Sequence, residues 1–344
     1  MEQMRRQLPL PSLLSLLALA CAGTPPSAEK VTREVDAGAP ERGIAATSAP
    51  APRDWTVSPA VVELDTPGDV FAVGDPHGDH DRLVRLLVAG GLLAAVPAPP
   101  DAAIWSGGQA VLVCTGDAID KWGQGLEVLT LLQGLEGAAA RQGGRVVFTL
   151  GNHEAEFLSG ESSDFTQQLA ARGLDPSEVA AGRHPLGVWL RGRPFAARIN
   201  DWFFAHAGDT GRRTLPELKS ELRAQLDATG FASPILLGPE GLLSARLSPA
   251  PWWESAAGPS RGLADFLTPL GVKHLGFGHQ PGRVIFADGV ERRAGTLFER
   301  AGQAVLLDTG MSRGVNDSEG MLLRIRGATL TGIGPDGVDV PLAK

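Results

Sequence analysis

The chain has 344 residues, of which 43% are hydrophobic and 20% are charged, so it is long enough for one large domain or two modest ones with a buried core. Its 31 Lys and Arg residues stand against 39 Asp and Glu residues, which gives a formal net charge of -8 at pH 7. An acidic balance without a basic stripe argues against nucleic acid as a partner.

Residues 1–21 are predicted to be a signal or lipoprotein peptide. Two arginines near the start are followed by an apolar run at 13–19 and then by small residues. Cys21 stands where a bacterial lipoprotein signal carries the cysteine that is lipidated, whereas cleavage after Ala20 or Ala22 leads to plain secretion. We therefore expect an exported protein, either periplasmic or an outer-membrane lipoprotein, with a membrane tether through an N-terminal lipid.

Residues 22–52 are predicted to form a disordered linker, because Ala, Pro, Gly and Ser with scattered charge bury too little apolar surface to order a segment. Residues 53–344 are predicted to form the folded domain. Its first apolar runs, at 69–73, 110–115 and 145–150, are predicted strands, and the segments between them carry leucines at helical spacing. This β-α-β-α-β order is typical of a parallel sheet, whose loops meet at the carboxyl ends of the strands.

Two polar segments of helical period, about 158–186 and 212–250, are predicted to be cap insertions over those loops. Between them, residues 195–209 are predicted to form two strands around Asn200-Asp201. Four later apolar runs predict short strands of a second, more antiparallel sheet: 274–280, 283–286, 304–310 and 321–327.

Five short motifs carry side chains of the types that bind metal ions. They are GDPHGD with Asp75 and His77, GDAID with Asp117 and Asp120, GNHE with Asn152 and His153, AHAGD with His206, and GHQ with His279. Carboxylate, imidazole and amide oxygen without thiolate suit Mn, Fe or Zn, and argue against a structural zinc. With one shared carboxylate, six such ligands are enough for two metal ions.

The order of these motifs resembles that of the calcineurin-like metallophosphoesterases. Within them it resembles the phosphoprotein phosphatase group, and there the bacterial Shewanella-like protein phosphatases. The resemblance covers roughly residues 69–327. It implies an α/β fold, a four-layer α-β-β-α sandwich of two mixed sheets with a helical cap insertion, and two divalent metal ions (Mn, Fe or Zn). The ligands that it implies are Asp75 and His77 for the first metal, Asp117 for both, and Asn152, His206 and His279 for the second.

The resemblance also implies catalytic roles, in which a hydroxide between the metals attacks phosphorus in line. His153 would protonate the leaving alkoxide, and Asp120 would orient that imidazole. From the residues alone, His153 could instead be a ligand, and Asp120 could pair with Lys121, which stands where the family commonly has arginine. Arg261 would clamp the phosphate. Other arginines that could serve are Arg191, Arg193, Arg212 and Arg213.

We therefore expect a dimetal-dependent phosphomonoester hydrolase, most simply a protein phosphatase for phosphoserine, phosphothreonine or phosphotyrosine. Its expected partner is a phosphorylated protein or a small phosphate ester. One alternative is a symmetrical dinucleoside tetraphosphate hydrolase, against which export argues because such nucleotides are chiefly intracellular. Another is a catalytically silent envelope binding protein of the same fold, against which the intact ligand set argues.

Overall fold

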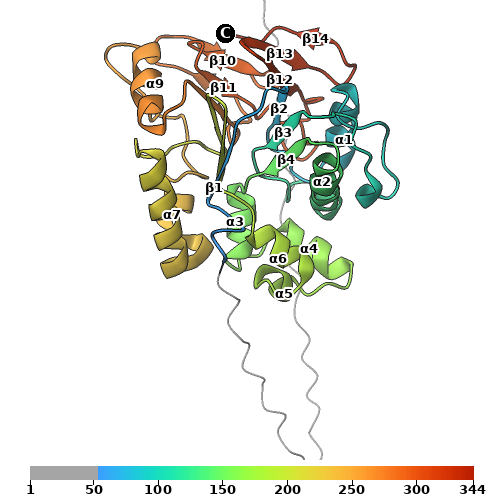
Figure 1. Cartoon of the computed structure of the whole chain (residues 1–344). Coiled ribbons are helices and arrows are strands. Elements are labelled where there is room, and N and C mark those ends of the chain that lie inside the picture. The colour runs from blue at the N-terminus through green and yellow to red at the C-terminus, as the bar shows by residue number, and fades with distance from the viewer. Residues whose placement is uncertain (1–52) are drawn as a thin grey trace, which may run out of the picture. The chain divides into compact units, whose positions relative to one another are not determined.

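Three strands that follow one another in the chain form one half of a six-stranded sheet. The computed structural model describes residues 53–344, and in it β2 (Val70–Val73), β3 (Val111–Cys114) and β4 (Arg145–Phe148) are parallel neighbours. Helices α1 (His80–Ala89) and α2 (Gly125–Ala140) connect them (Figure 1). The predicted β-α-β-α-β unit is confirmed.

The other half of this sheet comes from the end of the chain. Strand β12 (Leu322–Arg326) pairs antiparallel with β2, and β13 (Thr329–Ile333) and β14 (Asp339–Val340) continue the sheet outward. The prediction that the run at 321–327 belongs to the second sheet was wrong. The edge of β2 that β3 does not occupy is open to pairing, and pairing there buries Ile325 between the two sheets.

The second sheet also has six strands, of mixed direction, and this confirms the predicted fold class of two mixed sheets. Its strands β5 and β6, and β10 and β11, pair antiparallel, whereas the other pairs are parallel. The order is β1 (Val61–Leu64), β5 (Ala196–Ile199), β6 (Trp202–Ala205), β7 (His274–Phe277), β11 (Ala304–Leu306) and β10 (Phe298–Arg300). Strands β8 (Val284–Ile285) and β9 (Glu291–Arg292) form a separate ribbon.

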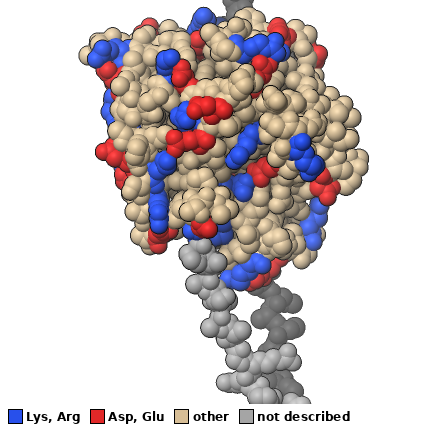
Figure 2. All heavy atoms as spheres, viewed as in Figure 1, with Lys and Arg blue, Asp and Glu red and all other residues tan. Residues whose placement is uncertain are grey.

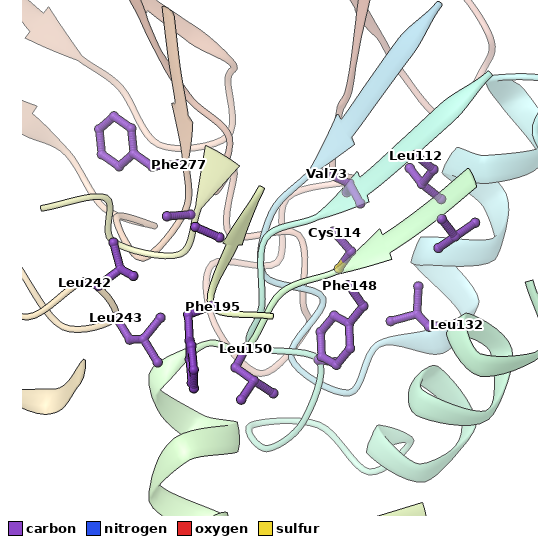
Figure 3. Close-up of a cluster of buried hydrophobic side chains, with 14 of the residues drawn as sticks. Val73, Leu112, Cys114, Leu132, Phe148, Leu150, Phe195, Leu242, Leu243 and Phe277 are labelled. Carbon is purple, nitrogen blue, oxygen red and sulfur yellow. The ribbon is translucent and has the colours of Figure 1, made fainter. Parts of the chain in front are cut away.

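Strands β2 and β3 of the first sheet are apolar throughout because both faces of the sheet are covered there. Side chains alternate between the faces, so Val111 and Val113 enter the core between the two sheets, while Leu112 and Cys114 face the helical side. Figure 3 shows Cys114 next to Phe148, with Leu132 of α2 on the other side of the Phe148 ring. The sheets are thereby held at a fixed distance, and the loops at the strand ends start from a rigid base.

Helices cover the end of the molecule toward which β2, β3 and β4 point. Figure 1 shows α4, α5 and α6 gathered below α3 there, with α7 alongside. The helices that follow α2 are α3 (Asn152–Leu158), α4 (Asp164–Ala171), α5 (Pro176–Ala180), α6 (Pro185–Arg191), α7 (Leu215–Thr229), α8 (Pro234–Leu237) and α9 (Pro259–Leu267). Single 3₁₀ turns are η1 (Pro100–Ala102), η2 (Gly230–Ala232) and η3 (Thr268–Leu270). Helices α4 to α6 and α7 to α8 lie largely in the two segments predicted as cap insertions.

The predicted signal peptide and linker lie outside the described residues. Within residues 53–344, no helix combines the length and the hydropathy needed to cross a membrane. Figure 2 shows Lys and Arg side chains interspersed with Asp and Glu side chains over the visible face.

Two helical glycines provide a test of how tightly the cap is packed. A Cβ on Gly187 of α6 would lie 1.8 Å from the carbonyl oxygen of Val179 in α5, whereas a Cβ on Gly137 of α2 would have only a side-chain nitrogen of Arg141 at 3.5 Å. Gly187→Ala is therefore expected to lower the free energy of unfolding by about 1–3 kcal/mol. Gly137→Ala, the matched control, is expected to raise it by up to about 1 kcal/mol.

Urea denaturation of both variants measures these changes as shifts of the midpoint at constant slope. A Gly187→Ala protein as stable as the unchanged chain would show that α5 and α6 are not in direct backbone contact.

Candidate metal centre

The strand ends bring the predicted ligand residues together. Strands β2, β3 and β4 are parallel neighbours in one sheet, and β6 and β7 are parallel neighbours in the other, so their carboxyl ends meet at one edge of the sandwich. Each is followed directly by part of the predicted site: Asp75 and His77 after β2, Asp117 after β3, Asn152 after β4, His206 after β6 and His279 after β7.

Asp117 lies at the centre of the cluster. Its Oδ2 is 3.4 Å from Nε2 of His77 and 3.3 Å from Nε2 of His206. Nε2 of His153 lies 3.9 Å from the same oxygen. Two groups of residues that could hold a metal ion share Asp117, one with His77 and His153 and one with His206 and His279. A single carboxylate therefore belongs to two candidate metal positions.

The hydrogen-bond partners of the two ring nitrogens of His206 indicate which charge this cluster binds. Nδ1 of His206 lies 2.8 Å from the carbonyl oxygen of Thr115, and because a carbonyl oxygen only accepts, Nδ1 carries the proton. Nε2 faces Oδ1 of Asn152 at 3.1 Å, Oδ2 of Asp117 at 3.3 Å and Nδ1 of His279 at 3.0 Å. Burial lowers the pKa of His206, but the charge of Asp117 outweighs it and raises the pKa. A positive charge therefore belongs at this position, either a second proton on His206 or a metal ion in its place.

Two further histidines of the cluster, His77 and His279, have pKa values lowered by burial. Nδ1 of His77 donates to the carbonyl oxygen of Ile119 at 3.3 Å, so its Nε2 lone pair is directed at Asp117. His279 forms a hydrogen bond to the backbone of Ser244, and burial with the neighbouring His206 lowers the pKa of His279 to about 2. Both imidazoles are held neutral, which is the state that metal coordination requires. Nδ1 of His279 lies 3.0 Å from Nε2 of His206.

Two carboxylates of the cluster have unpartnered oxygens. Oδ2 of Asp75 accepts the backbone N–H of His279 at 2.8 Å, but its buried Oδ1 has no hydrogen-bond partner among the described residues. Asp308, which follows β11, is also buried and its Oδ2 is likewise unpartnered within residues 53–344. Burial raises the pKa of both carboxyl groups, and the charges of Asp308 and Asp117 raise that of Asp75 further. Such a pair calls for a positive charge nearby, so the donor set fits bound divalent metal ions.

Asp308 was missed by the sequence analysis. It stands at the end of an apolar strand run, as the predicted ligands do, and this shared position was the available signal.

The ionisation of Asp117 differs from that of its two acidic neighbours. Burial alone would raise the pKa of the Asp117 carboxyl. The charges of the imidazoles of His206 and His153 outweigh burial and hold this pKa well below its usual range. The central carboxylate is therefore charged, as a bridging ligand must be.

His153 and Asp120 form a pair beside the cluster. Nδ1 of His153 donates to Oδ2 of Asp120 at 2.8 Å, and Oδ1 of Asp120 accepts the backbone N–H of Phe165 at 2.7 Å. Burial lowers the pKa of His153, but the charges of Asp117 and Asp120 outweigh it and raise the pKa to about 9. Among residues 53–344, the ion pair of Asp120 is with His153 and not with Lys121. The geometry suits a proton donor, and the alternative of His153 as a ligand stays open because Nε2 faces Asp117.

The backbone of the cluster is strained. Residues other than glycine rarely adopt φ between +20° and +160°. Five of the predicted site residues do so: Asp75 at 49°, His77 at 42°, Asp117 at 50°, Asp120 at 65° and His279 at 61°. The concentration of this conformation in one cluster indicates a functional site.

Glu154 of the GNHE motif holds the bridging loop in place. Its Oε2 accepts the N–H groups of Asp117 at 2.9 Å and Gly151 at 2.7 Å, and its Oε1 accepts those of Ala118 at 2.8 Å and Ile119 at 3.2 Å. Burial and the charge of Asp117 raise the pKa of Glu154 to about 7. The sequence assigned it no role, although its place in the motif was a signal.

The predicted phosphate clamp is not brought to the cluster. The side chain of Arg261 is 68% exposed and pairs with Asp265 one turn along α9. Arg246 instead donates to the carbonyl oxygen of His279. Of the other arginines considered, Arg193 pairs with Glu136 and Arg213 with Glu221. A clamp role for Arg261 stays a prediction.

Two facing mixed sheets with this donor set at their strand ends define a metallophosphoesterase. Residues 69–283 match the family described as calcineurin-like phosphoesterase, and the chain belongs to this family. The resemblance read from the motifs is thereby confirmed.

The chain is also similar to individual proteins that are named as phosphatases or as a nucleotide hydrolase. The chain is 30% identical over 124 residues to Shewanella-like protein phosphatase 2 of Arabidopsis thaliana, covering 36% of this chain and 29% of that protein. It is 31% identical over 169 residues to the symmetrical bis(5'-nucleosyl)-tetraphosphatase of Methylococcus capsulatus, covering 47% of this chain and 53% of that protein. Its fold is similar to that of the cold-active protein-tyrosine phosphatase of a psychrophilic Shewanella species, with a TM-score of 0.64, 23% identity and 83% of each chain covered.

Glu154→Gln tests the support of the bridging loop. Each oxygen of Glu154 accepts two backbone N–H groups, so an amide NH₂ in either place faces two donors and leaves both unpaired. The free energy of unfolding is expected to fall by about 1–3 kcal/mol, and the metal content after gel filtration to fall below that of the unchanged chain. Glu161→Gln, at an exposed residue, is the control and is expected to change neither.

Denaturant titration and elemental analysis are the two measurements. If Glu154→Gln kept the stability and the metal content of the control, Asp117 would not depend on Glu154.

Proposed function

We propose that the chain is a dimetal-dependent phosphomonoester hydrolase that acts as a protein phosphatase. The observation that carries the proposal is the carboxylate of Asp117, which belongs to two candidate metal groups at once. Family membership supports phosphoester chemistry. Because the matched regions cover between 29% and 53% of the curated relatives' own lengths, their activities come to this chain only as part of the proposal.

Asp75 and His77 would hold one divalent cation, Asn152, His206 and His279 the other, and Asp117 would touch both. Mn, Fe or Zn would suit these ligands. When bound, the two cations supply Lewis acidity and neutralise charge on the phosphate ester.

Side chains of the protein would donate the proton, orient the proton donor and attract the phosphate. His153, whose pKa is raised to about 9, carries a proton on Nε2 that can pass to the leaving oxygen of the ester. Asp120 accepts from Nδ1 and so keeps Nε2 turned toward Asp117 and the cluster. Lys121 follows directly, is exposed and forms no ion pair within residues 53–344, so its charge is available to attract a phosphate.

The preference among phosphoserine, phosphothreonine and phosphotyrosine is part of the proposal. The cold-active protein-tyrosine phosphatase and a protein serine/threonine phosphatase of Saccharomyces cerevisiae, with a TM-score of 0.54 at 20% identity, share the fold alone. A panel of phosphopeptides carrying each residue in one sequence context separates the three substrates.

A second candidate is symmetrical hydrolysis of dinucleoside tetraphosphates, which the similarity to the Methylococcus capsulatus enzyme favours. Diadenosine tetraphosphate and a phosphopeptide, compared in one assay at equal metal concentration, discriminate between the two. A silent binding protein would turn over neither substrate.

Two variants separate the metal bridge from the proton donor. Asp117→Asn is expected to lose bound metal and to lower kcat/KM for an aryl phosphate at least about 100-fold, because it removes the shared charge. His153→Asn is expected to keep the metal content and to lower kcat by about 10²–10⁴, because it removes only the acid. Added Mn²⁺ is expected to support activity of the unchanged chain, and EDTA to abolish it.

Hydrolysis of p-nitrophenyl phosphate measures the first effect. Hydrolysis of a phosphoserine peptide, whose alkoxide leaving group needs a proton, measures the second, and elemental analysis gives the metal content of both variants. Full activity of Asp117→Asn would refute the bridging role, and loss of metal in His153→Asn would make His153 a ligand.

We also propose that the protein is exported and tethered to a membrane through a lipid on Cys21. The support is the pattern of residues 1–21, which lie outside the described part of the chain. Cys21→Ser is expected to move the full-length protein from the detergent phase to the aqueous phase in a Triton X-114 partition of expressing bacteria. The control Cys114→Ser changes a buried thiol and is expected to leave partition unchanged. Equal partition of Cys21→Ser and the unchanged chain would contradict the lipid anchor.

A further inference from the structure

A cavity of about 420 Å³ lies apart from the metal centre, between the start of the described chain, α6 and the end of α7. Figure 1 shows α6 and α7 at the end of the molecule where the described chain begins. None of the predicted metal ligands lines the cavity. Its volume is within the range of small-molecule sites, which is about 300–1,000 Å³.

Two arginines in the wall of this cavity have no acidic partner. Within residues 53–344, neither Arg53 nor Arg191 forms an ion pair. The guanidinium of Arg53 lies 4.8 Å from the ring centre of Trp55 and donates to the backbone carbonyls of Ser58, Pro59, Arg191, Gly192 and Arg193. Its charge therefore faces dipoles and a ring but no carboxylate.

Arg191 has hydrogen-bonding capacity to spare. Its Nη1 donates to the carbonyl oxygen of Ala180 at 2.9 Å, and its guanidinium carbon lies 4.9 Å from the ring centre of Phe231. Nε and Nη2 form no hydrogen bond with the described residues. Gly182 leaves room for this side chain, since a Cβ there would lie 2.7 Å from Cδ of Arg191. A guanidinium with a free edge is well suited to a bound oxyanion.

Partial burial disfavours the charged forms of Arg53 and Arg191. Burial, together with the charges of Arg193 and Arg191, lowers the pKa of Arg53 to about 10, and burial also lowers the pKa of Arg191. Acids do line the cavity, but both are exposed and bound elsewhere. Asp54 accepts from Thr56, and Asp227 accepts Nε1 of Trp55 at 3.2 Å. A half-buried cation without a carboxylate partner is stabilised by an anion that enters the site.

Part of the remaining wall is formed by apolar side chains. Leu226 and Phe231 are buried at the cavity, and Val188 at its rim is 60% exposed. Apolar surface beside an unneutralised guanidinium matches a ligand that has one anionic group on an apolar body. An inorganic anion alone would leave the apolar side chains of Leu226 and Phe231 in contact with water.

We propose that the cavity binds a small amphipathic anion, in which a carboxylate, sulfonate or phosphate group meets Arg191 and an apolar body lies against Leu226 and Phe231. This site is separate from the metal centre and does not depend on the proposed hydrolase activity. The proposed ligand is a small molecule, because a volume of about 420 Å³ is that of small-molecule sites.

The test uses the full chain and the probe 1-anilinonaphthalene-8-sulfonate, an aromatic sulfonate whose fluorescence rises on binding. Saturable binding at one site is expected. Octanoate is expected to displace the probe, and 1-octanol at the same concentration is not, because the two differ only in the charged group. The Asp117→Asn chain is expected to bind the probe as the unchanged chain does, since the metal centre is elsewhere.

Two kinds of variant locate the site. Arg191→Gln is expected to weaken probe binding at least about tenfold, and Arg191→Lys to restore part of it. Because Arg191 also bonds to Ala180, a second variant avoids disturbing the fold. Val188→Asp places a negative charge at the exposed rim and is expected to weaken binding by repulsion, whereas the matched Val188→Asn is expected to have little effect.

Circular dichroism and the melting temperature show that each variant is folded. The proposal is overturned if the full chain shows no saturable binding, or if octanol competes as well as octanoate. It is also overturned if folded Arg191→Gln and Val188→Asp proteins bind the probe as tightly as the unchanged chain, or if Asp117→Asn abolishes binding.

Discussion

The metal centre depends on where its histidine protons go. Nδ1 of His77 and Nδ1 of His206 both donate to backbone carbonyls of the loop that carries Asp117, so Nε2 of each ring turns toward that carboxylate at 3.3–3.4 Å. The charge of the carboxylate is balanced there by a proton on Nε2 or by a metal ion in place of that proton. The backbone carbonyls thus fix which ring nitrogen faces Asp117 and is free to bind a cation.

Holding that arrangement requires both backbone strain and a compensating network. Asp117 adopts a left-handed conformation at φ 50°, which costs about 1–3 kcal/mol for a residue other than glycine. Four backbone N–H groups around it converge on the buried carboxylate of Glu154, and this offsets the strain. A Cβ on Gly151 would lie 2.1 Å from Oδ1 of Asp117, so the loop after β4 needs a glycine at this position. The rigid sheets supply the base on which such strain can persist.

The ligand residues could be predicted from the sequence because local pattern and topology coincide there. Each follows an apolar run, and the ends of parallel strands converge without further information. Arg261 had no such constraint, since it lies on a helix whose position depends on packing between distant segments. The pairing of β12 with β2 was equally beyond local pattern, because an open strand edge is a property of the assembled sheet. Asp308 shared the strand-end position but lacked a motif around it.

Charge without a partner of opposite sign appears twice in the described part of the chain, with opposite sign. At the strand ends, the buried Asp75 and Asp308 have unpartnered oxygens and raised pKa values, so protons or cations have to balance them. In the cavity beside α6, the half-buried Arg53 and Arg191 have no carboxylate partner and lowered pKa values, and the proposed anion would balance them. Folding alone does not favour either arrangement, because apolar replacements of similar volume often cost nothing or stabilise. A ligand of opposite charge would make each cluster more favourable, so the physical argument that favours cations at the first site favours an anion at the second.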